Sequence, residues 1–305
     1  MTDGYTAVPF TELNKFVFCR PHGGFNDILC QVELCWRYAE RFDRALVLDG
    51  QTCGMLGSFA PYFVPKANKI PVFTNVTEEL FAHLNALTCY PHSIQGRLDK
   101  YISEIQPDLN KMVVSDSREK LAFDRKRDYS EQVLVHEQFG GGTRSRAGLS
   151  RLTLSPDIVS LVESALEKLP RSYIGIHVRN TDRRTDYKEL FEKLFVKVTG
   201  RNVLICSDDP SVLSFGRKYF ELSKVYTSSE PPDLGGDAIH VPWNHHEDST
   251  RRGAVLSSII DLLALGGAEK LYFGRAKDRR FSGFSLLAKY ISKNKWIRDS
   301  LLRRS

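Results

Sequence analysis

Three clusters of charged and hydroxyl side chains in the second half of the sequence each come directly after a short apolar run. The clusters are HVRNTDRRTDY (177–187), SDDPS (207–211) and GRAKDRRFSGFS (274–285). In the first cluster, Arg179, Arg183 and Arg184 can clamp a phosphate group through paired N–H bonds. Asp182 and Asp186 can order those arginines or accept hydrogen bonds from sugar hydroxyls. Because a simple turn would use Gly, Pro or Asn, this composition predicts a site for a charged ligand.

The second and third clusters place acids and small residues at two expected helix N-termini. Asp208 and Asp209 directly precede Pro210, and helix capping is the simplest role for one of the pair. Ser282 and Ser285 lie at the other helix start, where backbone N–H groups bind phosphate oxygens. Both clusters therefore suit an anionic ligand as well as a structural role.

The histidines of this half have simpler explanations than a functional one. His177 lies late in an apolar strand, where a histidine can equally be a hydrogen-bonded core residue. His245 and His246 are adjacent in WNHHED (243–248), so their side chains project apart and a surface loop explains them better than a metal site. The adjacent acids of SDDPS also lack the spacing of an Asp-x-Asp metal site. We expect no metal and no cofactor.

Alternating strand and helix patterns surround these clusters. Buried apolar runs predict strands at 173–178, 202–209, 224–228 and 270–274. Amphipathic or capped patterns predict helices at 155–169, 187–198, 210–220, 251–267 and 284–297. In a parallel sheet of this kind, ligands bind at the carboxyl ends of the strands, so the three clusters are expected to converge on one ligand.

The first half opens with the same kind of unit. A strand at 16–20 leads through a Gly-Gly turn into a helix that Asn26 or Asp27 is placed to cap, and a second strand follows at 44–50. Further strands of this sheet are predicted at 70–75, 111–116 and 132–138. The Gly-rich basic stretch at 139–151 has no periodicity and predicts a flexible connector or a loop facing an interdomain cleft.

These patterns predict an α/β protein with two Rossmann-like, doubly wound domains that face a cleft. The Gly-rich seam places the boundary between residues 1–150 and residues 151–305. A chain of 305 residues is longer than one hydrophobic core usually fills, which also favours two domains.

The composition indicates a cytoplasmic protein. No run of 18 apolar residues predicts a membrane span, and the N-terminus lacks the pattern of a signal peptide. The six cysteines form no CxxC pair, and several fall inside strand or helix patterns, as buried free thiols do.

The positive charge is concentrated at the C-terminal end. Residues 270–305 contain 11 Lys and Arg against 2 Asp and Glu, so the rest of the chain sums to −3 of the total +6. This distribution argues against a general nucleic-acid binder and for one local anionic contact. The last segment, KYISKNKWIRDSLLRRS, predicts a C-terminal helix that packs its apolar stripe; docking on the inner face of an anionic membrane is the alternative.

The motifs IHVRNTDRRTDY, SDDPS, SSIIDLLALGGAEKLYFG and FSGFSLLAKY, taken in order, resemble those of the fucosyltransferase superfamily. This superfamily includes nodulation fucosyltransferases, core α-1,6-fucosyltransferases and protein O-fucosyltransferases. The match runs from Tyr173 to Tyr290, over a third of the chain. The turn at 22–31 also resembles the glycine-rich turn that opens the first domain of many of these enzymes, and its candidate residues are His22, Gly23, Gly24 and Asn26.

The resemblance implies a GT-B fold and an inverting, metal-independent glycosyl transfer. The C-terminal domain would hold the sugar nucleotide, and the N-terminal domain would be the acceptor side. Arg179 matches the motif arginine that binds the donor diphosphate, with His177 and Asp182 at the flanking motif positions. The other implied donor contacts are Asp208 or Asp209, Asp261 in the helix before the last strand, and Ser282 or Ser285.

Two positions depart from the family pattern. Asn180 stands where the family has a second arginine, and Arg183 or Arg184 can take over its charge. A basic insert at Lys277–Arg280 replaces small residues. The donor is therefore expected to be a nucleotide sugar, with GDP-fucose as one candidate.

Bond cleavage between a sugar and a diphosphate builds negative charge on the leaving group, which arginines and helix N-termini stabilise. A carboxylate can deprotonate the acceptor hydroxyl, and Asp186 is the hypothesis for this base, beside Arg179 and Asp182 as catalytic candidates. The acceptor would be a glycan or a lipid-linked glycan of a bacterial-type polysaccharide or glycoconjugate.

Three other functions stay open from the sequence. The enzyme can use a UDP- or CMP-linked sugar, or the chain can bind a nucleotide or glycan without turnover. A nicotinamide dehydrogenase is a weaker alternative, because HGGFND is not GxGxxG.

Overall fold

The computed structural model describes residues 8–50, 55–182, 184–230, 248–276 and 281–303. The chain divides into two compact units, which are described separately below. Unit 1 contains residues 8–23, 27–50 and 57–152, and unit 2 contains residues 24–26, 55–56 and the described residues from Thr153 onward. The predicted boundary at 150/151 lies two residues from this division.

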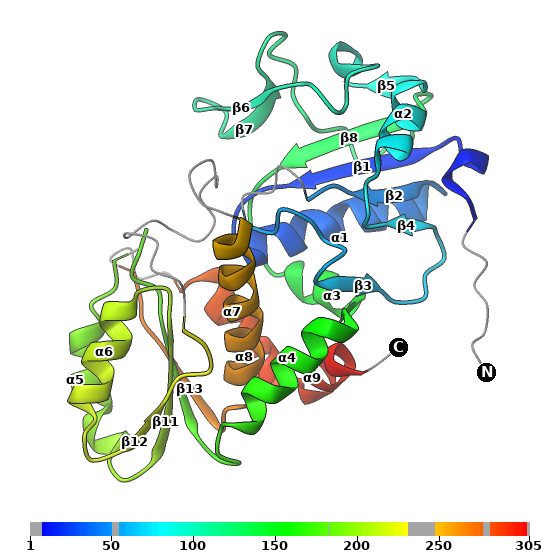
Figure 1. The fold of residues 1–305 in the computed structure, drawn as a ribbon. Helices are drawn as coiled ribbons and strands as arrows, with labels where there is room; N and C mark the ends of the chain where they lie inside the picture. Colours follow the sequence, from blue (N-terminus) through cyan, green and yellow to red (C-terminus); the bar gives the residue numbers. More distant parts are fainter. Residues whose placement is uncertain (1–7, 51–54, 183, 231–247, 277–280, 304–305) are drawn as a thin grey trace, which may run out of the picture. The chain divides into compact units, whose positions relative to one another are not determined.

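Unit 1 is built on a parallel sheet of five strands in the order β4-β2-β1-β8-β5 (Figure 1). The strands are β1 (Phe16–Pro21), β2 (Ala45–Leu48), β4 (Val72–Phe73), β5 (Cys89–Tyr90) and β8 (Val133–Gln138). Every residue of β1 and β8 is buried, as expected for central strands that are covered on both faces.

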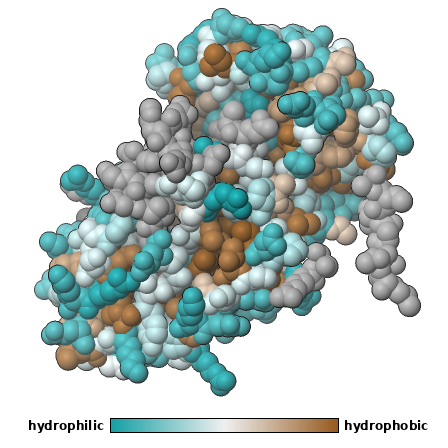
Figure 2. Space-filling view, in the orientation of Figure 1, coloured by the Kyte–Doolittle hydropathy of each residue, from teal (hydrophilic) through white to brown (hydrophobic). Residues whose placement is uncertain are grey.

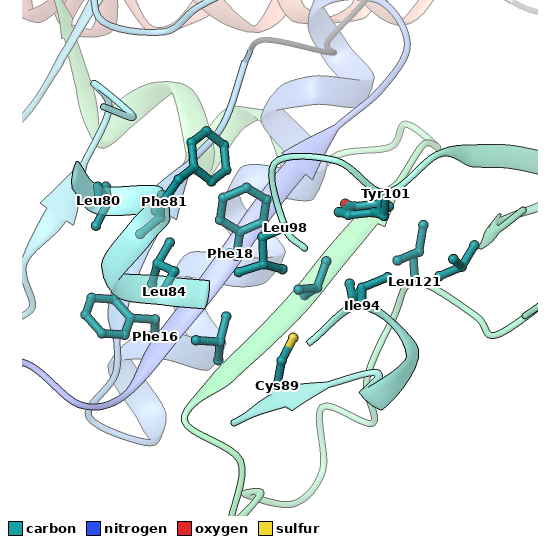
Figure 3. Packing of buried hydrophobic residues seen from close by; sticks show 14 of the residues in the cluster. Phe16, Phe18, Leu80, Phe81, Leu84, Cys89, Ile94, Leu98, Tyr101 and Leu121 are labelled. Carbon is teal, nitrogen blue, oxygen red and sulfur yellow. The ribbon is translucent and has the colours of Figure 1, made fainter. Parts of the chain in front are cut away.

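The face of this sheet toward α2 (Glu78–Asn85) carries an apolar cluster of unit 1. Figure 3 shows Phe16 and Phe18 of β1 beside Leu80, Phe81 and Leu84 of α2. Because side chains alternate along a strand, the residues between these phenylalanines point to the opposite face, against which α1 (Phe25–Arg41) packs (Figure 1). The predicted strands at 16–20, 44–50, 70–75 and 132–138 are thus confirmed.

The predicted helix after β1 is confirmed, but its predicted cap is wrong. Helix α1 begins at Phe25, so Asn26 and Asp27 lie inside its first turn and not before it. The chain enters the helix through Gly23, whose φ of +96° falls in the left-handed region that glycine adopts at no steric cost. A Cβ at this position would also lie 2.9 Å from Asp27 Cβ.

Two further segments of unit 1 differ from the prediction. The strand at 111–116 is β7 (Lys111–Val114), which pairs antiparallel with β6 (Ser103–Gln106) in a separate two-stranded sheet. The segment at 139–151 contains the helix α3 (Ser145–Ser150), although its sequence lacks helical periodicity. A Cβ at Gly148 would lie 2.5 Å from the backbone oxygen of Leu29, so close packing on α1, and not local pattern, accounts for this helix.

Unit 1 also contains the 3-10 turns Phe10–Glu12 and His92–Ile94 and the short strand β3 (Phe63–Pro65). The strand β9 (Leu152–Leu154) spans the division between the two units, which falls after Leu152.

Unit 2 has a parallel sheet of four strands in the order β12-β11-β10-β13. The strands are β10 (Ile174–Val178), β11 (Asn202–Ser207), β12 (Lys224–Tyr226) and β13 (Lys270–Phe273). The helices are α4 (Pro156–Glu167), α5 (Tyr187–Val198), α6 (Pro210–Tyr219), α7 (Asp248–Gly267), α8 (Gly283–Lys293) and α9 (Lys295–Leu302). Figure 1 shows α5 and α6 on one face of the sheet and the other four helices gathered on the opposite face.

The two faces of β10 are occupied by different kinds of side chain. Ile174, Ile176 and Val178 pack into the apolar cluster formed with α5 and α6. Between them, a Cβ at Gly175 would lie 3.2 Å from a Leu265 side-chain carbon of α7 and 2.7 Å from a Leu271 side-chain carbon of β13. The absence of a side chain at Gly175 thus lets α7 pack closely on the strand, and the α/β class with parallel sheets is confirmed.

The predicted last helix is in fact two helices. The break falls at Asn294, whose φ of −130° and ψ of 68° are not helical. The apolar stripe continues across it, since Ile291 of α8 and Ile297 of α9 are both buried.

Hydrophilic side chains cover most of the molecular face seen in Figure 2, with small apolar areas between them. Among the helices in the described part of the chain, none is both long and apolar enough to cross a bilayer.

Candidate active site

A small hollow in unit 2 brings the ends of two central strands together with two helices. It is lined by residues at the carboxyl ends of β10 and β11, on α7 and at the start of α8. Six residues of the predicted site lie in this lining: Gly24, His177, Arg179, Asp208, Asp261 and Ser282. Its volume is about 80 Å³, so a ligand of nucleotide size would extend beyond it.

Asp208 organises the loop that follows β10. Its carboxylate accepts hydrogen bonds from the Asn180 backbone N–H and the Thr181 hydroxyl, each at 2.7 Å. Burial raises the pKa of Asp208, and the two hydrogen bonds and the charge of Arg179 only partly offset this. The carboxylate is therefore held in place by the Asn180 N–H, the Thr181 hydroxyl and the nearby guanidinium of Arg179.

Asn180 closes this loop from its other side. The side-chain amide donates to Asp209 at 2.7 Å, and its oxygen accepts from the Thr185 backbone N–H at 3.2 Å. An arginine at this position has no acceptor and cannot make the second bond. The departure from the family motif at Asn180 therefore replaces a charge with a structural contact.

Arg179 projects from this loop in a defined orientation. Its Nε and Nη2 donate to the two carboxylate oxygens of Asp182 at 2.7 and 2.8 Å, and Asp208 Oδ2 lies 4.0 Å from Nε. The side chains of Arg179 and Asp182 are 23% and 30% exposed, so a ligand can reach the pair from solvent. Such a fork can exchange a carboxylate for a phosphate without changing its geometry.

The two adjacent acids of SDDPS have separate roles. Asp209 caps α6, since its side chain accepts from the Ser211 backbone N–H at 2.8 Å. Although burial alone would raise the pKa of Asp209, hydrogen bonds from Asn180 and Ser211 lower it. Asp208, in contrast, faces the hollow.

His177 is buried and neutral. Its Nδ1 lies 2.7 Å from the Ser285 hydroxyl, and its ring packs on Phe284 at 5.0 Å between centroids. Burial, with the nearby charge of Arg179, lowers the pKa of His177 to about 3. The imidazole can therefore form a hydrogen bond with a ligand, but it does not contribute a positive charge.

Asp261 is a buried acid on α7 that also lines the hollow. Its Oδ1 accepts from the hydroxyls of Ser228 and Ser229 at 2.6 and 2.8 Å. Burial raises the pKa of Asp261 to about 6, and these hydroxyls partly counter the effect. At neutral pH the carboxylate is ionised at an energetic cost, which a ligand with N–H donors would reduce.

The start of α8 completes this wall of the hollow. Ser282 caps the helix by accepting from the Ser285 backbone N–H at 3.4 Å, and the Ser285 hydroxyl is engaged with His177. A Cβ at Gly283 would lie 2.8 Å from the Asn26 side chain, so Asn26 packs directly on the first turn of this helix.

The residues predicted in the N-terminal turn belong to two different units. Gly24 lines the hollow together with Phe25, and Asn26 lies at Gly283; these three residues belong to unit 2. His22 and Gly23 belong to unit 1, where His22 Nε2 lies 2.7 Å from Glu137 Oε1.

Asp186, the predicted base, caps α5 by accepting from the Glu189 backbone N–H at 3.1 Å. It is exposed and lies outside the lining of the hollow described above. Arg184 is also exposed. Arg183, the basic insert Lys277–Arg280 and the pair His245 and His246 lie outside the described residues, so their predicted roles stay predictions.

Several residues of the site were not found from the sequence. Ser228 and Ser229 hold Asp261, and the lining also includes Ser207, Ser257, Ser258 and Phe284. The serine pair lies two residues after the end of β12, so the rule that polar residues after a strand end face the ligand would have found it. The α7 serines carry no such signal, because they lie within an apolar helix.

No protein-family model and no curated protein sequence matches the chain. Solved structures do match. The α-1,6-fucosyltransferase NodZ, from a crystal soaked with GDP-fucose, is similar with a TM-score of 0.59 at 17% identity, covering 91% of this chain and 92% of its own. Fucosyltransferase NodZ from Bradyrhizobium gives 0.59 at 19% identity, with 91% and 93% covered.

POFUT1 in complex with GDP is similar with a TM-score of 0.54 at 12% identity, covering 94% of this chain and 96% of its own. At these identities the comparisons show a shared fold. The resemblance to the fucosyltransferase superfamily is thereby confirmed at the level of the fold.

Proposed function

We propose that this protein is a glycosyltransferase that moves a sugar, with fucose as the leading candidate, from a GDP-linked donor to a glycan acceptor. The observation that carries the proposal is the convergence of Arg179, Asp261 and the α8 N-terminus on one hollow at the carboxyl edge of the unit 2 sheet. The shared fold with fucosyltransferases crystallised with GDP-fucose or GDP supports the same reading.

Arg179 and the first turn of α8 suit the diphosphate. Transfer leaves a GDP leaving group on which negative charge grows, and a preorganised guanidinium and helix N–H groups lower the energy of that state. In the proposed cycle Asp182 holds the guanidinium of Arg179 in place before the donor binds, and Arg179 then exchanges this carboxylate for the phosphate oxygens. This supply of positive charge makes a metal unnecessary for the proposed reaction.

Asp261 suits the guanine base. The Watson–Crick edge of guanine presents N1–H and N2–H donors side by side, and an ionised carboxylate presents two acceptors. Uracil and cytosine do not offer that pair of donors. The serines that bind Oδ1 and the burial of the carboxylate favour a ligand that donates to it.

The transfer is proposed to invert the sugar's anomeric configuration, with unit 1 as the acceptor side. Asp186 stays the hypothesis for the base that deprotonates the acceptor. Its capping contact to Glu189 N–H leaves one carboxylate oxygen for a second partner. The acceptor is a glycan or a lipid-linked glycan, and the proposed location is the cytoplasm, with α8 and α9 as the membrane-facing surface if the acceptor is lipid-linked.

The test is a thermal shift of the full chain with GDP, UDP, CMP, ADP and NAD. A ligand at a hundredfold excess over its dissociation constant stabilises the folded state by about 2.7 kcal/mol. We expect a shift with GDP that is lost in Arg179→Ala and kept in Arg171→Ala, which removes an exposed arginine from the same unit. A shift with UDP or CMP alone would mean that the donor is a UDP- or CMP-linked sugar. A shift with NAD alone would point to a dehydrogenase. No shift with any of the five ligands would contradict the proposed function.

A further inference from the structure

Helix α1 of unit 1 carries a polar and basic stripe along one side. Gln31, Leu34, Tyr38 and Arg41 are spaced by three or four residues, and Arg37 lies three residues after Leu34 and four before Arg41, so all five lie along one side of the helix. From Gln31 to Arg41 this face extends about 15 Å along the helix axis. The stripe is therefore longer than one small anion.

Two adjoining hollows lie along this stripe. The first, the arginine hollow, has a volume of about 350 Å³ and is lined by Leu34, Tyr38 and the four arginines Arg37, Arg41, Arg125 and Arg144. The second, the lysine hollow, has a volume of about 200 Å³, and its lining includes Gln31, Lys111, Lys120 and His136. Leu34 and Arg125 line both, so the two hollows form one track.

The six cations of this track have no carboxylate partners. In the part of the chain that the structure describes, none of them forms an ion pair, and neither lining contains Asp or Glu. All six cations are exposed to solvent, whereas three less exposed arginines of unit 1 are paired. Arg20, Arg44 and Arg151 each bind a carboxylate oxygen, at 2.6, 2.7 and 2.6 Å. The positive charge of the track is thus left available for a ligand.

His136 lines the lysine hollow and has one ring nitrogen without a hydrogen-bond partner among the described residues. Gln31 donates from its amide to Gly140 O at 2.6 Å, which turns its oxygen toward His136 Nε2 at 2.8 Å. That oxygen only accepts, so Nε2 carries the proton and Nδ1 is a bare acceptor, buried and without a donor among the described residues. Burial and the neighbouring Arg125 and lysines lower the pKa of His136 to about 3, which keeps the ring neutral.

The shape and chemistry of the track favour a carbohydrate over other anions. A membrane surface is flat, whereas these cations line hollows of ligand size. Single-stranded nucleic acid needs exposed aromatic rings for stacking, whereas here Tyr38 and Phe123 are buried and Phe139 is half-buried. A sugar chain with acidic groups supplies anions for the arginines and hydroxyl donors for an acceptor such as His136 Nδ1.

We propose that this track of unit 1 binds an acidic oligosaccharide, one that carries phosphate, sulfate or carboxylate groups, as part of the acceptor. The binding site is inferred from unit 1 alone. The statement that its ligand is the acceptor rests on the proposed transferase function. The proposal narrows the acceptor class from glycans in general to anionic glycans.

The test is calorimetric titration of the full chain with a heparin tetrasaccharide, and with the neutral N-acetylchitotetraose for comparison. Saturating GDP is present, and the titration is repeated in Arg179→Ala so that the donor site does not contribute. We expect Arg37→Gln/Arg41→Gln to weaken tetrasaccharide binding about tenfold, because each exposed charge pair contributes a modest amount. The matched control Lys168→Gln/Arg171→Gln, which removes two exposed charges from unit 2, should change the affinity less than twofold.

Three results would overturn the proposal: no binding of the acidic tetrasaccharide by the wild type, equal loss in both double variants, or binding of the neutral tetrasaccharide as tight as that of the acidic one. Binding to vesicles containing phosphatidylserine through Arg37 and Arg41, without tetrasaccharide binding, would also overturn it in favour of a membrane surface. If GDP fails to bind while the tetrasaccharide result holds, the donor assignment fails and the track remains.

Discussion

Replacing Asp261 by Asn is expected to make the protein more stable at neutral pH and less able to bind GDP. The stability effect follows from the raised pKa. The folded-state pKa of Asp261 is about 6, compared with 3.8 for an unperturbed aspartate. The folded state therefore binds the proton more tightly, and the stabilisation that protonation provides is present below about pH 4 and is lost as the pH rises through 6.

The size of the effect follows from the shift. A difference of about two pKa units corresponds to roughly 3 kcal/mol between the two protonation states, of which roughly 2 kcal/mol is lost between pH 4.5 and 8. Asn does not titrate in this range, and its oxygen can still accept from Ser228 and Ser229. The free energy of unfolding of Asp261→Asn, relative to the wild type, should thus rise by this amount over the same pH range.

The binding effect has the opposite sign. In Asp261→Asn the amide oxygen is held by Ser228 and Ser229, and an NH2 donor takes the place of Oδ2, so the side chain no longer accepts from guanine N1–H or N2–H. Loss of this charge-assisted contact is expected to weaken GDP binding by about tenfold to a hundredfold.

The assay is urea denaturation at pH 4.5 and pH 8, together with calorimetric titration with GDP at pH 7.5. Asp108→Asn, which removes the same charge from an exposed position of unit 1, serves as the control. A stability difference that is the same at both pH values would refute the burial argument. Unchanged GDP affinity would refute the assignment of Asp261 to the base.

Two further predictions concern the acceptor side of the reaction and the C-terminal helices. Asp186→Asn keeps a good helix cap, so it should preserve the Tm and GDP affinity while lowering kcat at least a hundredfold; near-normal kcat would remove Asp186 as the base. Trp296 and Leu286 are 57% and 41% exposed on helices rich in lysine. If this surface docks on membranes, Trp296→Ala/Leu286→Ala should reduce sedimentation with anionic vesicles severalfold, with Val196→Ala on α5 as the exposed apolar control, and equal effects of both would contradict it.

Local pattern was enough to predict much of unit 2. Strands, helices and the Asp209 cap before Pro210 depend on periodicity and on the nearest few residues, so they could be predicted from the sequence. The expectation that polar clusters after β10 and β11 meet at one edge also followed, because parallel strands end on the same side.

The tertiary structure decided the roles within those clusters. That Asp208 faces the hollow while Asp209 caps a helix depends on which way the β10 loop folds over them. The serines that hold Asp261 lie in the chain after β12, which is two strands away from β10 across β11, and strand order leaves no local trace in the sequence.

Contacts between segments that are distant in the sequence also explain two features of unit 1 that the sequence alone did not predict. The helix α3 exists because Gly148 lets it pack on α1, and the arginine hollow exists because α1, α3 and the chain after β7 meet there. Arg37, Arg125 and Arg144 are far apart in the sequence, each within an ordinary charged surface segment. Residue types and their spacing thus predict local chemistry, whereas the packing of distant segments determines which side chains meet at one binding site.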